Sequence, residues 1–401
     1  MAPSKHPWNV TTTSLPLPRP HHLFQVLTSP REVVSNLTPN WFASVMGTGI
    51  VANAAESLPL QFPGLRAGAA VVWAIAAVAL VALTVATGLH WLWYRGTART
   101  HHTHPVIAHF YGAPPMAFLT VGAGALLVGR DWIGLTAAVH IDWILWVIGT
   151  VLGLVSAIAV PYLAFTRIEL LPESAFGGWL MPIVPPMVSA STGALLIPYV
   201  TVGQVRESLL WGCFAMFGLS LVSSLIVISL IWGRLTQHKV GPATMVPTLW
   251  IVLGPVGQSI TAANLLGGNV HLAVAAGTAH ALQVFGLLYG FPMLGFALMW
   301  TTIAAGIMMR TARKRLPFSL TWWSFTFPIG TCVTGLNGLA ARTDLSVMQV
   351  LAVIYYVGLV VAWVTVAVRT FHGSVVRRTL LAPPTPALTQ SHDARDCCRS
   401  S

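Results

Sequence analysis

The sequence predicts an all-α integral membrane protein, in which ten transmembrane helices form five quasi-symmetric helical hairpins around a central pore. Three observations lead to this fold class. The 401 residues are 55% hydrophobic and 8% charged, with a mean hydropathy of +0.73, whereas soluble domains average roughly 25% charged residues. The apolar residues gather in ten long segments, and prolines interrupt alternate segments at nearly equal intervals.

Each of the ten segments is close to or above the roughly 20 residues that cross the hydrocarbon core of a bilayer. Trp and Tyr lie at many of their ends, where such side chains anchor helices at the membrane interface. The predicted spans are 41–58, 65–94, 106–128, 143–165, 179–202, 209–232, 245–266, 282–308, 320–339 and 347–371. A membrane domain is therefore predicted over 38–372, and the Pro/Ser/Thr-rich ends 1–37 and 373–401 are predicted to be disordered.

The basic residues predict the topology. Seventeen of the 21 Lys and Arg residues fall on the side of the N-terminus, and only Arg66, Arg130, Arg206 and Arg342 fall on the other side. The positive-inside rule then places both termini in the cytoplasm. The net charge of +11 follows from this asymmetry, so nucleic-acid binding is not expected. The high Ala and Gly content and the short loops favour a plasma membrane of bacterial type, the inner membrane.

Prolines repeat along the chain in the third, fifth, seventh and ninth segments. The intervals from Pro115 to Pro185, to Pro255 and to Pro328 are 70, 70 and 73 residues. A step of 68 residues back from Pro115 reaches Gly47, in the glycine-rich middle of the first segment. Each repeat is thus predicted to hold one broken helix followed by one plainer helix. The predicted helix breaks, which are expected to line the pore, are Gly47, Gly49, Pro114, Pro115, Pro185, Pro186, Pro255 and Pro328.

Broken helices predict a protein-enclosed centre, because a freed backbone carbonyl costs several kcal/mol in lipid. Proline within a helix removes a donor and costs about 3 kcal/mol or more. The five broken segments run in the same direction, so their restarted N-termini, each with about half a positive charge, would attract an anion without any basic side chain. Glycines that allow close backbone approach are Gly47, Gly49, Gly112, Gly193, Gly254, Gly257 and Gly330.

Polar side chains on the broken segments are candidate anion contacts. The alternative for each is that its hydroxyl or amide only bonds a neighbouring helix or a carbonyl one turn back. The leading candidates are Thr48, Ser189, Gln258, Ser259 and Thr326, within a wider set that also holds Ser44, Thr120, Ser191, Thr192, Thr261 and Asn264.

Five motifs in order carry a resemblance to a known family. "PNWFASVMGTGIVANAAESLP", "HPVIAHFYGAPPMAF", "WLMPIVPPMVSASTGALL", "LWIVLGPVGQS" and "WWSFTFPIG" are similar to those of the tellurite-resistance/dicarboxylate transporter family. The likeness covers about 38–372. It is nearest to the branch of sulfite efflux pumps and malic acid permeases, and the family also includes plant slow anion channels.

The resemblance implies ten helices in five hairpins, a five-helix anion pore and a homotrimer with one pore per subunit. It also implies a phenylalanine that occludes the pore from the ninth helix. The matching "WWSFTFP" makes Phe327 that residue, with Phe325 as the nearby alternative. An aromatic ring at a hydrophobic constriction can block ions and water, and it can rotate aside.

Ionisable residues near the spans are few, and each is a functional hypothesis. Glu56 and Asp142 fall near the predicted outer interface, where solvation alone can explain them. His109 and His280 are candidates for a proton-linked role, with a structural histidine as the alternative. The "HHTH" at 101–104 lacks cysteine or carboxylate partners, so neither a metal nor another cofactor is expected.

Three functional classes are compatible with these residues. The first is a passive or gated conduit for small anions such as sulfite, C4-dicarboxylates including malate, or tellurite-type oxyanions. The second is a proton-coupled carrier of dicarboxylate or sulfite. The third, a membrane enzyme or a receptor without flux, is the weakest, because no catalytic grouping stands in the spans. The sequence therefore predicts anion transport and no enzymatic activity.

Overall fold

Helices make up the regular structure of the described chain. A computed structural model describes residues 32–169, 172–313, 316–376 and Leu380, and its elements over these residues are α-, 3₁₀- and π-helices. Most of the two predicted tails lies outside the described residues. Within them, seven helical stretches are long and apolar enough to cross a membrane: Leu65–Trp93, Ile107–Ile133, Leu135–Thr166, Gln204–His238, Ala243–Leu272, Ala276–Ala312 and Ser346–Val376.

Two sets of α-helices alternate along the described chain. We call the first set the inner helices: α2 (Phe42–Glu56), α5 (Ala113–Gly124), α8 (Pro185–Leu196), α10 (Leu253–Asn269) and α12 (Thr326–Thr343). We call the second set the outer helices: α3 (Leu65–Trp93), α7 (Leu135–Thr166), α9 (Gln204–His238), α11 (Ala276–Ala312) and α13 (Ser346–Phe371). Shorter elements connect them, among them α1 (Glu32–Ser35), α4 (Arg95–Thr100), the π-helix η3 (Ala125–Gly129) and α6 (Arg130–Ile133).

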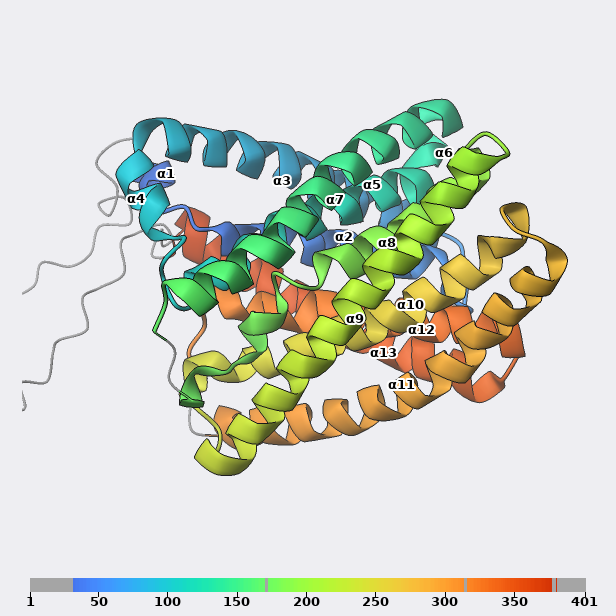
Figure 1. Ribbon diagram of the computed structural model, residues 1–401. Coiled ribbons are helices and arrows are strands. Elements are labelled where there is room, and N and C mark those ends of the chain that lie inside the picture. Colours follow the sequence, from blue (N-terminus) through green and yellow to red (C-terminus); the bar gives the residue numbers. More distant parts are fainter. Residues whose placement is uncertain (1–31, 170–171, 314–315, 377–379, 381–401) are drawn as a thin grey trace, which may run out of the picture.

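The inner helices pack as a closed ring. α2 contacts α5, α5 contacts α8, α8 contacts α10, α10 contacts α12, and α12 returns to α2. Each outer helix packs on the inner helix before it and touches a second one, so the outer set surrounds the ring. Figure 1 shows α3 along the top and α11 along the bottom, with α2, α10 and α12 between them. The finer prediction of ten membrane crossings in five symmetric hairpins stays a prediction, because α2, α8 and α12 are too short or too polar to be identified as spans by length and composition.

Neighbouring inner helices run parallel. Between α2 and α12, a side chain on Gly47 would meet Thr326 and one on Gly330 would meet Ile50, and further along Asn337 donates to the Ala54 carbonyl. Residue numbers thus rise together on both helices. This confirms the expectation that these two segments share a direction, and α8 and α10 agree with it through the hydrogen bonds from Gln258 to Ser191 and from Asn269 to Ala194.

A 3₁₀-helix precedes each inner α-helix, directly in four cases and with the turn 181–184 in between in the case of α8. The preceding elements are η1 (Pro39–Trp41), η2 (Ile107–Gly112), η5 (Gly177–Leu180), η7 (Ala243–Val252) and η9 (Leu320–Phe325). The predicted prolines fall in the first turn of α5, α8, α10 and α12, where proline is tolerated because its missing N–H has no partner within the helix. The predicted prolines of these four segments therefore lie at the starts of inner α-helices.

The first segment breaks elsewhere than predicted. α2 is a regular α-helix through Gly47 and Gly49, and the change from 3₁₀- to α-helix occurs at Trp41–Phe42 instead. The two glycines serve close packing, because a Cβ on Gly47 would collide with Thr326 and one on Gly49 would lie 2.8 Å from Thr120 Cγ2. The prediction of a break at Gly47 and Gly49 was wrong, since a glycine without proline leaves the hydrogen-bond ladder intact.

Donors on the outer helices satisfy carbonyls that the breaks set free. Ser220 on α9 donates to the Ile183 carbonyl at 2.7 Å, and Ser156 on α7 donates to the Pro182 carbonyl at 3.1 Å. Trp300 on α11 likewise donates to the carbonyl of Leu249 at 2.9 Å. Buried backbone groups need such partners, so the outer helices stabilise the broken conformation of the inner ones.

Candidate functional site

A cavity of about 300 Å³ lies between the inner helices. All five inner helices contribute to its wall, and the contributing residues follow helical spacing, as with Gln258, Thr261 and Asn264 on α10. The polar or ionisable residues of the wall are Asn53, Glu56, Ser57, Thr120, Ser191, Thr192, Gln258, Thr261, Asn264, Thr334 and Asn337. The cavity therefore lies on the axis of the ring and has a mixed polar and apolar surface.

A second, much narrower cavity of about 20 Å³ lies at the start of the inner helices. Its volume is close to that of a single water molecule. The first turns or N-caps of all five inner helices contribute to it, through Ala43, Met116, Val184, Gly254 and Pro328. Helix N-termini carry about half a positive charge each, so five of them converge on this constriction without any basic side chain in its wall.

Phe327 separates the two cavities. It is the residue that the two linings share, and only 2% of it is exposed. Phe325 lies elsewhere: its ring packs perpendicular to that of Trp250 at 5.8 Å and contacts Trp322 at 5.7 Å, and it lines neither cavity. Of the two predicted gate residues, Phe327 thus lies between the two cavities, and Phe325 packs against aromatic rings away from both.

Four side-chain amides face the wide cavity, and each donates to a protein acceptor. Asn53 donates to the Thr120 carbonyl at 3.0 Å, Asn264 to the Ile260 carbonyl at 2.9 Å, and Asn337 to Ser57 Oγ at 2.9 Å. Gln258 donates to Ser191 Oγ. The oxygen of each amide is buried without a protein partner. The cavity wall thus holds unpaired polar atoms, which need water or a polar ligand.

Three hydroxyls of the wide cavity donate within their own helices. Thr120 bonds the Met116 carbonyl at 2.6 Å, and Ser191 and Thr192 both bond the Val188 carbonyl at 2.9 Å. The hydrogens of these hydroxyls are therefore used in bonds to carbonyls of the same helix, which is the structural alternative given for them above. Their oxygens can still accept hydrogen bonds, as Ser191 does from Gln258.

One of the five leading anion-contact candidates lines the cavity, and it is Gln258. Thr48 lies against an outer helix, because it accepts from Trp363 of α13 at 3.1 Å. Ser189 is fully buried away from the cavity, and its carbonyl accepts from Trp146 of α7 at 2.9 Å. Ser259 donates to the Val256 carbonyl and does not reach the lining.

Thr326 also lies away from the cavity lining, because it packs against Gly47 and donates to the Trp323 carbonyl at 2.8 Å. These four candidates share the helices of the cavity but point elsewhere. Sequence reasoning missed Asn53, Thr334 and Asn337 as lining residues. Their signal was available, since polar residues three apart, as in Thr334 and Asn337, mark one face of a helix.

The prolines shape the helix starts more than they line the axis. Pro328 lines the narrow cavity. Pro114 and Pro115 instead face a separate cavity of about 200 Å³ between α5 and outer helix α7, and Pro185 lies beside Gly153 of α7. Pro115, Pro185, Pro186, Pro255 and Pro328 are all buried in the described structure, so none faces lipid.

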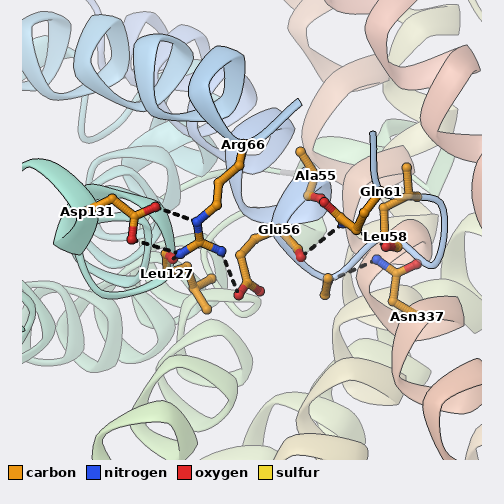
Figure 2. Close-up of polar contacts among 9 residues, drawn as sticks. Ala55, Glu56, Leu58, Gln61, Arg66, Leu127, Asp131 and Asn337 are labelled. Atoms are coloured by element: carbon orange, nitrogen blue, oxygen red, sulfur yellow. Dashed lines mark hydrogen bonds and ion pairs between the residues drawn. The ribbon is translucent and has the colours of Figure 1, made fainter. Parts of the chain in front are cut away.

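An ion-pair cluster lies at the far end of the wide cavity (Figure 2). Arg66 of α3 makes an ion pair with Glu56 at 3.6 Å and a two-pronged hydrogen-bonded pair with Asp131 of α6. It also donates to the Leu127 carbonyl at 3.0 Å. Glu56 and Leu127 both line the cavity. Glu56 was expected only to be solvated at the interface, and it has a specific partner instead.

Asp142 differs from its prediction more strongly. It is fully buried on α7 and packs against α5, where a Cβ on Gly122 would lie 2.7 Å from Asp142 Oδ1. Neither carboxyl oxygen has a hydrogen-bond partner among the described residues. Solvation therefore does not explain this residue, and an unpaired carboxylate in such a place would cost several kcal/mol.

The two candidate histidines lie apart from both cavities. His109 is buried in η2 and stacks on Trp179 at 5.8 Å, whereas His280 is exposed near the start of α11. In the "HHTH" segment, His101 stacks on His90 at 5.4 Å and His102 lies 4.9 Å from the ring of Tyr111. Burial lowers the pKa of His101 to about 4. No group of three metal ligands occurs in the part of the chain that the structure describes.

Comparison with known proteins reveals full-length relatives. The sulfite efflux pump of Arthroderma otae is 26% identical over 86% of this chain and 92% of its own length. An uncharacterized transporter of Methanocaldococcus jannaschii is 24% identical over 87% of this chain and 96% of its own. A putative malic acid transport protein of Schizosaccharomyces pombe is 20% identical over 90% of this chain and 86% of its own.

A family model matches nearly the whole described region. The model is that of the voltage-dependent anion channel, SLAC1, and it covers residues 36–371, which include every helix that lines the two cavities. The resemblance read from the five motifs is thereby confirmed, and so is the prediction of an anion transporter instead of an enzyme. This multi-pass membrane protein belongs to the SLAC1 family of voltage-dependent anion channels.

Proposed function

We propose that the protein conducts small anions along the axis of the inner helices, with Phe327 as the gate. The observation that carries this proposal is that Phe327 lines both axial cavities, so that one aromatic side chain divides an otherwise continuous path. Five helix N-termini converge at the narrow cavity, and their partial positive charges favour a negative solute there. Movement of one ring would join the two cavities.

The architecture that we propose has all ten segments crossing the membrane as five hairpins. The closed ring of inner helices and the alternation of inner and outer helices support it. In this arrangement the outer helices face lipid, and α2, α8 and α12 cross inside their protection although they are short or polar. The distribution of basic residues supports cytoplasmic termini in a plasma membrane, and the family resemblance supports a homotrimer.

The substrates that we propose are sulfite, C4-dicarboxylates such as malate, and related oxyanions. Support comes from the relatives, which are named as a sulfite efflux pump and a putative malic acid transport protein. The wall of the wide cavity, with its hydroxyls and amides and a paired arginine at its end, suits a solute with several acceptor oxygens bound partly through water.

The test is anion flux in vesicles that contain the purified protein, with a panel of sulfite, malate, tellurite, nitrate and chloride. Phe327→Ala is expected to raise the flux of a permeant anion about tenfold, the effect of lowering a barrier by about 1.4 kcal/mol. The physical reason is that alanine leaves open the position that the phenyl ring fills. The measurement is the initial rate of uptake per folded protein.

Phe325→Ala is the matched control, since it removes the same ring two residues away from a position that lines neither cavity. It is expected to leave the flux close to that of the wild type. Equal flux in Phe327→Ala and wild-type vesicles, with both proteins folded, would contradict the gate. An absence of flux for every anion in all three proteins would contradict the proposed function itself.

Proton-coupled transport is the second candidate, and Asp142 is the observation that favours it. A buried carboxyl without a hydrogen-bond partner, one helix away from the cavity wall, is a candidate proton-binding group. The two functions differ in one measurement, which is uptake driven by a pH gradient alone. Uptake against an anion gradient under these conditions requires a carrier, whereas a channel only dissipates the anion gradient.

A further inference from the structure

Glu56 is the acidic residue of the wide cavity wall. It is the last residue of α2, whereas Phe327 lies in the first turn of the parallel helix α12, so the carboxylate and the gate lie at opposite ends of the cavity. Its side chain is 21% exposed. A lone carboxylate at this position would repel any anion that enters or leaves the cavity by this end.

Arg66 is placed to cancel that charge. It reaches from α3, outside the ring, to Glu56 at 3.6 Å, and its other contacts are with Asp131 and the Leu127 carbonyl. Figure 2 shows the guanidinium between the two carboxylates, of which Glu56 lines the cavity and Asp131 does not. Asp131 and the Leu127 carbonyl hold the guanidinium in orientation, because bidentate pairing fixes an arginine more firmly than a single contact.

We propose that Arg66 determines anion selectivity at this end of the cavity by neutralising Glu56. The proposal rests on the proposed function, since it concerns the same path. Arg66 acts as a positioned counter-charge: it does not line the cavity, and its contribution is to the field at the mouth. The pair therefore keeps a polar residue at the mouth, while the guanidinium that Glu56 shares with Asp131 offsets part of the repulsion that the carboxylate alone would exert on an anion.

The first test is a charge-rescue series measured as anion flux. Arg66→Gln is expected to lower the flux about five- to tenfold, the size expected for one unscreened charge several ångströms from the path. Glu56→Gln in the same chain is expected to restore the flux to within about twofold of the wild type, since no carboxylate then needs a counter-charge. Arg66→Lys keeps the charge and should keep most of the flux.

Arg130→Gln is the matched control, because it removes a positive charge from the neighbouring residue on α6, outside the cavity lining. Its flux should remain within about twofold of the wild type, because Arg130 is half-buried outside the cavity lining and makes no ion pair with Glu56. The loss in Arg66→Gln should also shrink at high salt, because a mouth exposed to water is screened. A loss that neither Glu56→Gln nor salt reverses would show that Arg66 only braces the helices, and it would overturn the proposal.

A second measurement does not depend on transport. Ser57→Cys places a thiol beside Glu56 on the lining, in a chain with Cys397 and Cys398 changed to Ser; Cys213 and Cys332 are buried. The ratio of reaction rates with an anionic and a cationic methanethiosulfonate reagent reports the local potential. Arg66→Gln should lower this ratio severalfold, and Glu56→Gln should restore it. An unchanged ratio would overturn the proposal even if no anion flux were found.

Discussion

The inner and outer helices have opposite surroundings. In the inner stretches Ile107–Ile133 and Ala243–Leu272, 83% and 94% of the most apolar window is buried, whereas in the outer stretches the share is between 17% and 28%. Outer residues such as Val78, Ile158 and Phe165 are 71%, 67% and 85% exposed. Both sets contain few charged residues, but only the outer set exposes a large apolar surface that suits contact with lipid.

The difference shows where broken helix starts, close glycine contacts and side-chain amides are tolerated in a membrane protein. Inner helices carry the broken starts, the close glycine contacts and the amides of the cavity, because protein surrounds them on every side. Outer helices are long, and α7 and α11 continue through an internal proline, Pro161 and Pro292; the outer helices use a few Ser and Trp donors to satisfy the inner set. In this fold, the polar content of a helix thus depends on whether it belongs to the inner or the outer set.

The largest expected effect concerns glycine in the two sets. A Cβ on Gly257 of α10 would lie 2.6 Å from the Cys332 backbone nitrogen of α12, whereas nothing lies within 4 Å of a Cβ on Gly295 of α11. Gly257→Ala is expected to destabilise the protein by about 1–3 kcal/mol through overpacking. Gly295→Ala should be neutral or stabilise it by about 0.5–1 kcal/mol. Thermal unfolding in detergent measures both, and equal midpoints would break the comparison.

A smaller effect is expected from two neighbouring residues of one inner helix. Gln258 lines the cavity and bonds Ser191, whose hydroxyl can donate as well as accept, so the amide can turn its NH₂ group toward a solute. Gln258→Leu is expected to lower anion flux by up to about tenfold, the worth of one typical hydrogen bond.

Ser259→Ala provides the comparison for Gln258→Leu, because Ser259 is fully buried and bonded to the Val256 carbonyl, away from the lining. Its flux should match the wild type. If Ser259→Ala lost more flux than Gln258→Leu, the assignment of the two faces of α10 would be reversed.

The smallest effect concerns the connection between outer helix α3 and the inner element η2. Burial lowers the pKa of His101 from its ordinary value of 6.5 to about 4, and His90 adds to the shift. Below about pH 6.5, His101 is therefore protonated in the unfolded chain but not in the folded protein. The free energy of unfolding falls for this reason as the pH drops from 6.5 to 4.

His101→Gln should remove that part of the acid sensitivity, about 1 kcal/mol or less because solvent screens part of the charge on the ring. The measurement is the unfolding midpoint at pH 7.5 and at pH 4.5 for each protein, so that any loss of the ring stacking is common to both conditions. His140→Gln, at an exposed position on α7, is the control. A slope that is unchanged in His101→Gln would contradict this role for the buried ring.

The position of the site along the ring axis could be predicted from the sequence better than the identity of the side chains that line it. Proline is a local steric signal, so helix starts at Pro115, Pro185 and Pro328 could be located from sequence alone. The rotation of each helix about its own axis depends on packing with distant segments. Successive residues of an α-helix differ by about 100° in direction, which is why Gln258 faces the cavity and Ser259 does not.

Tertiary contacts account for the other differences. Gly47 resembles a break in sequence, but only the approach of Thr326 explains why glycine is needed there. Glu56 and Asp142 both fall at predicted span ends, and packing gives one an arginine partner and buries the other without one. The sequence pattern of a single segment does not reveal these contacts, because they join residues of different helices.

The contact between α2 and α12 is also the seam at which the ring closes, and it has a consequence for synthesis. The hydrogen bond from Asn337 to Ala54 joins residues 283 positions apart, so the first inner helix has to wait in the bilayer until nearly the whole chain has left the ribosome. Until then the flank of α2 that carries Gly47 and Ile50 lacks its neighbour. Closure of the ring therefore needs a contact between the first and the last inner helices, and a nascent chain that stops before α12 is left with an open wall.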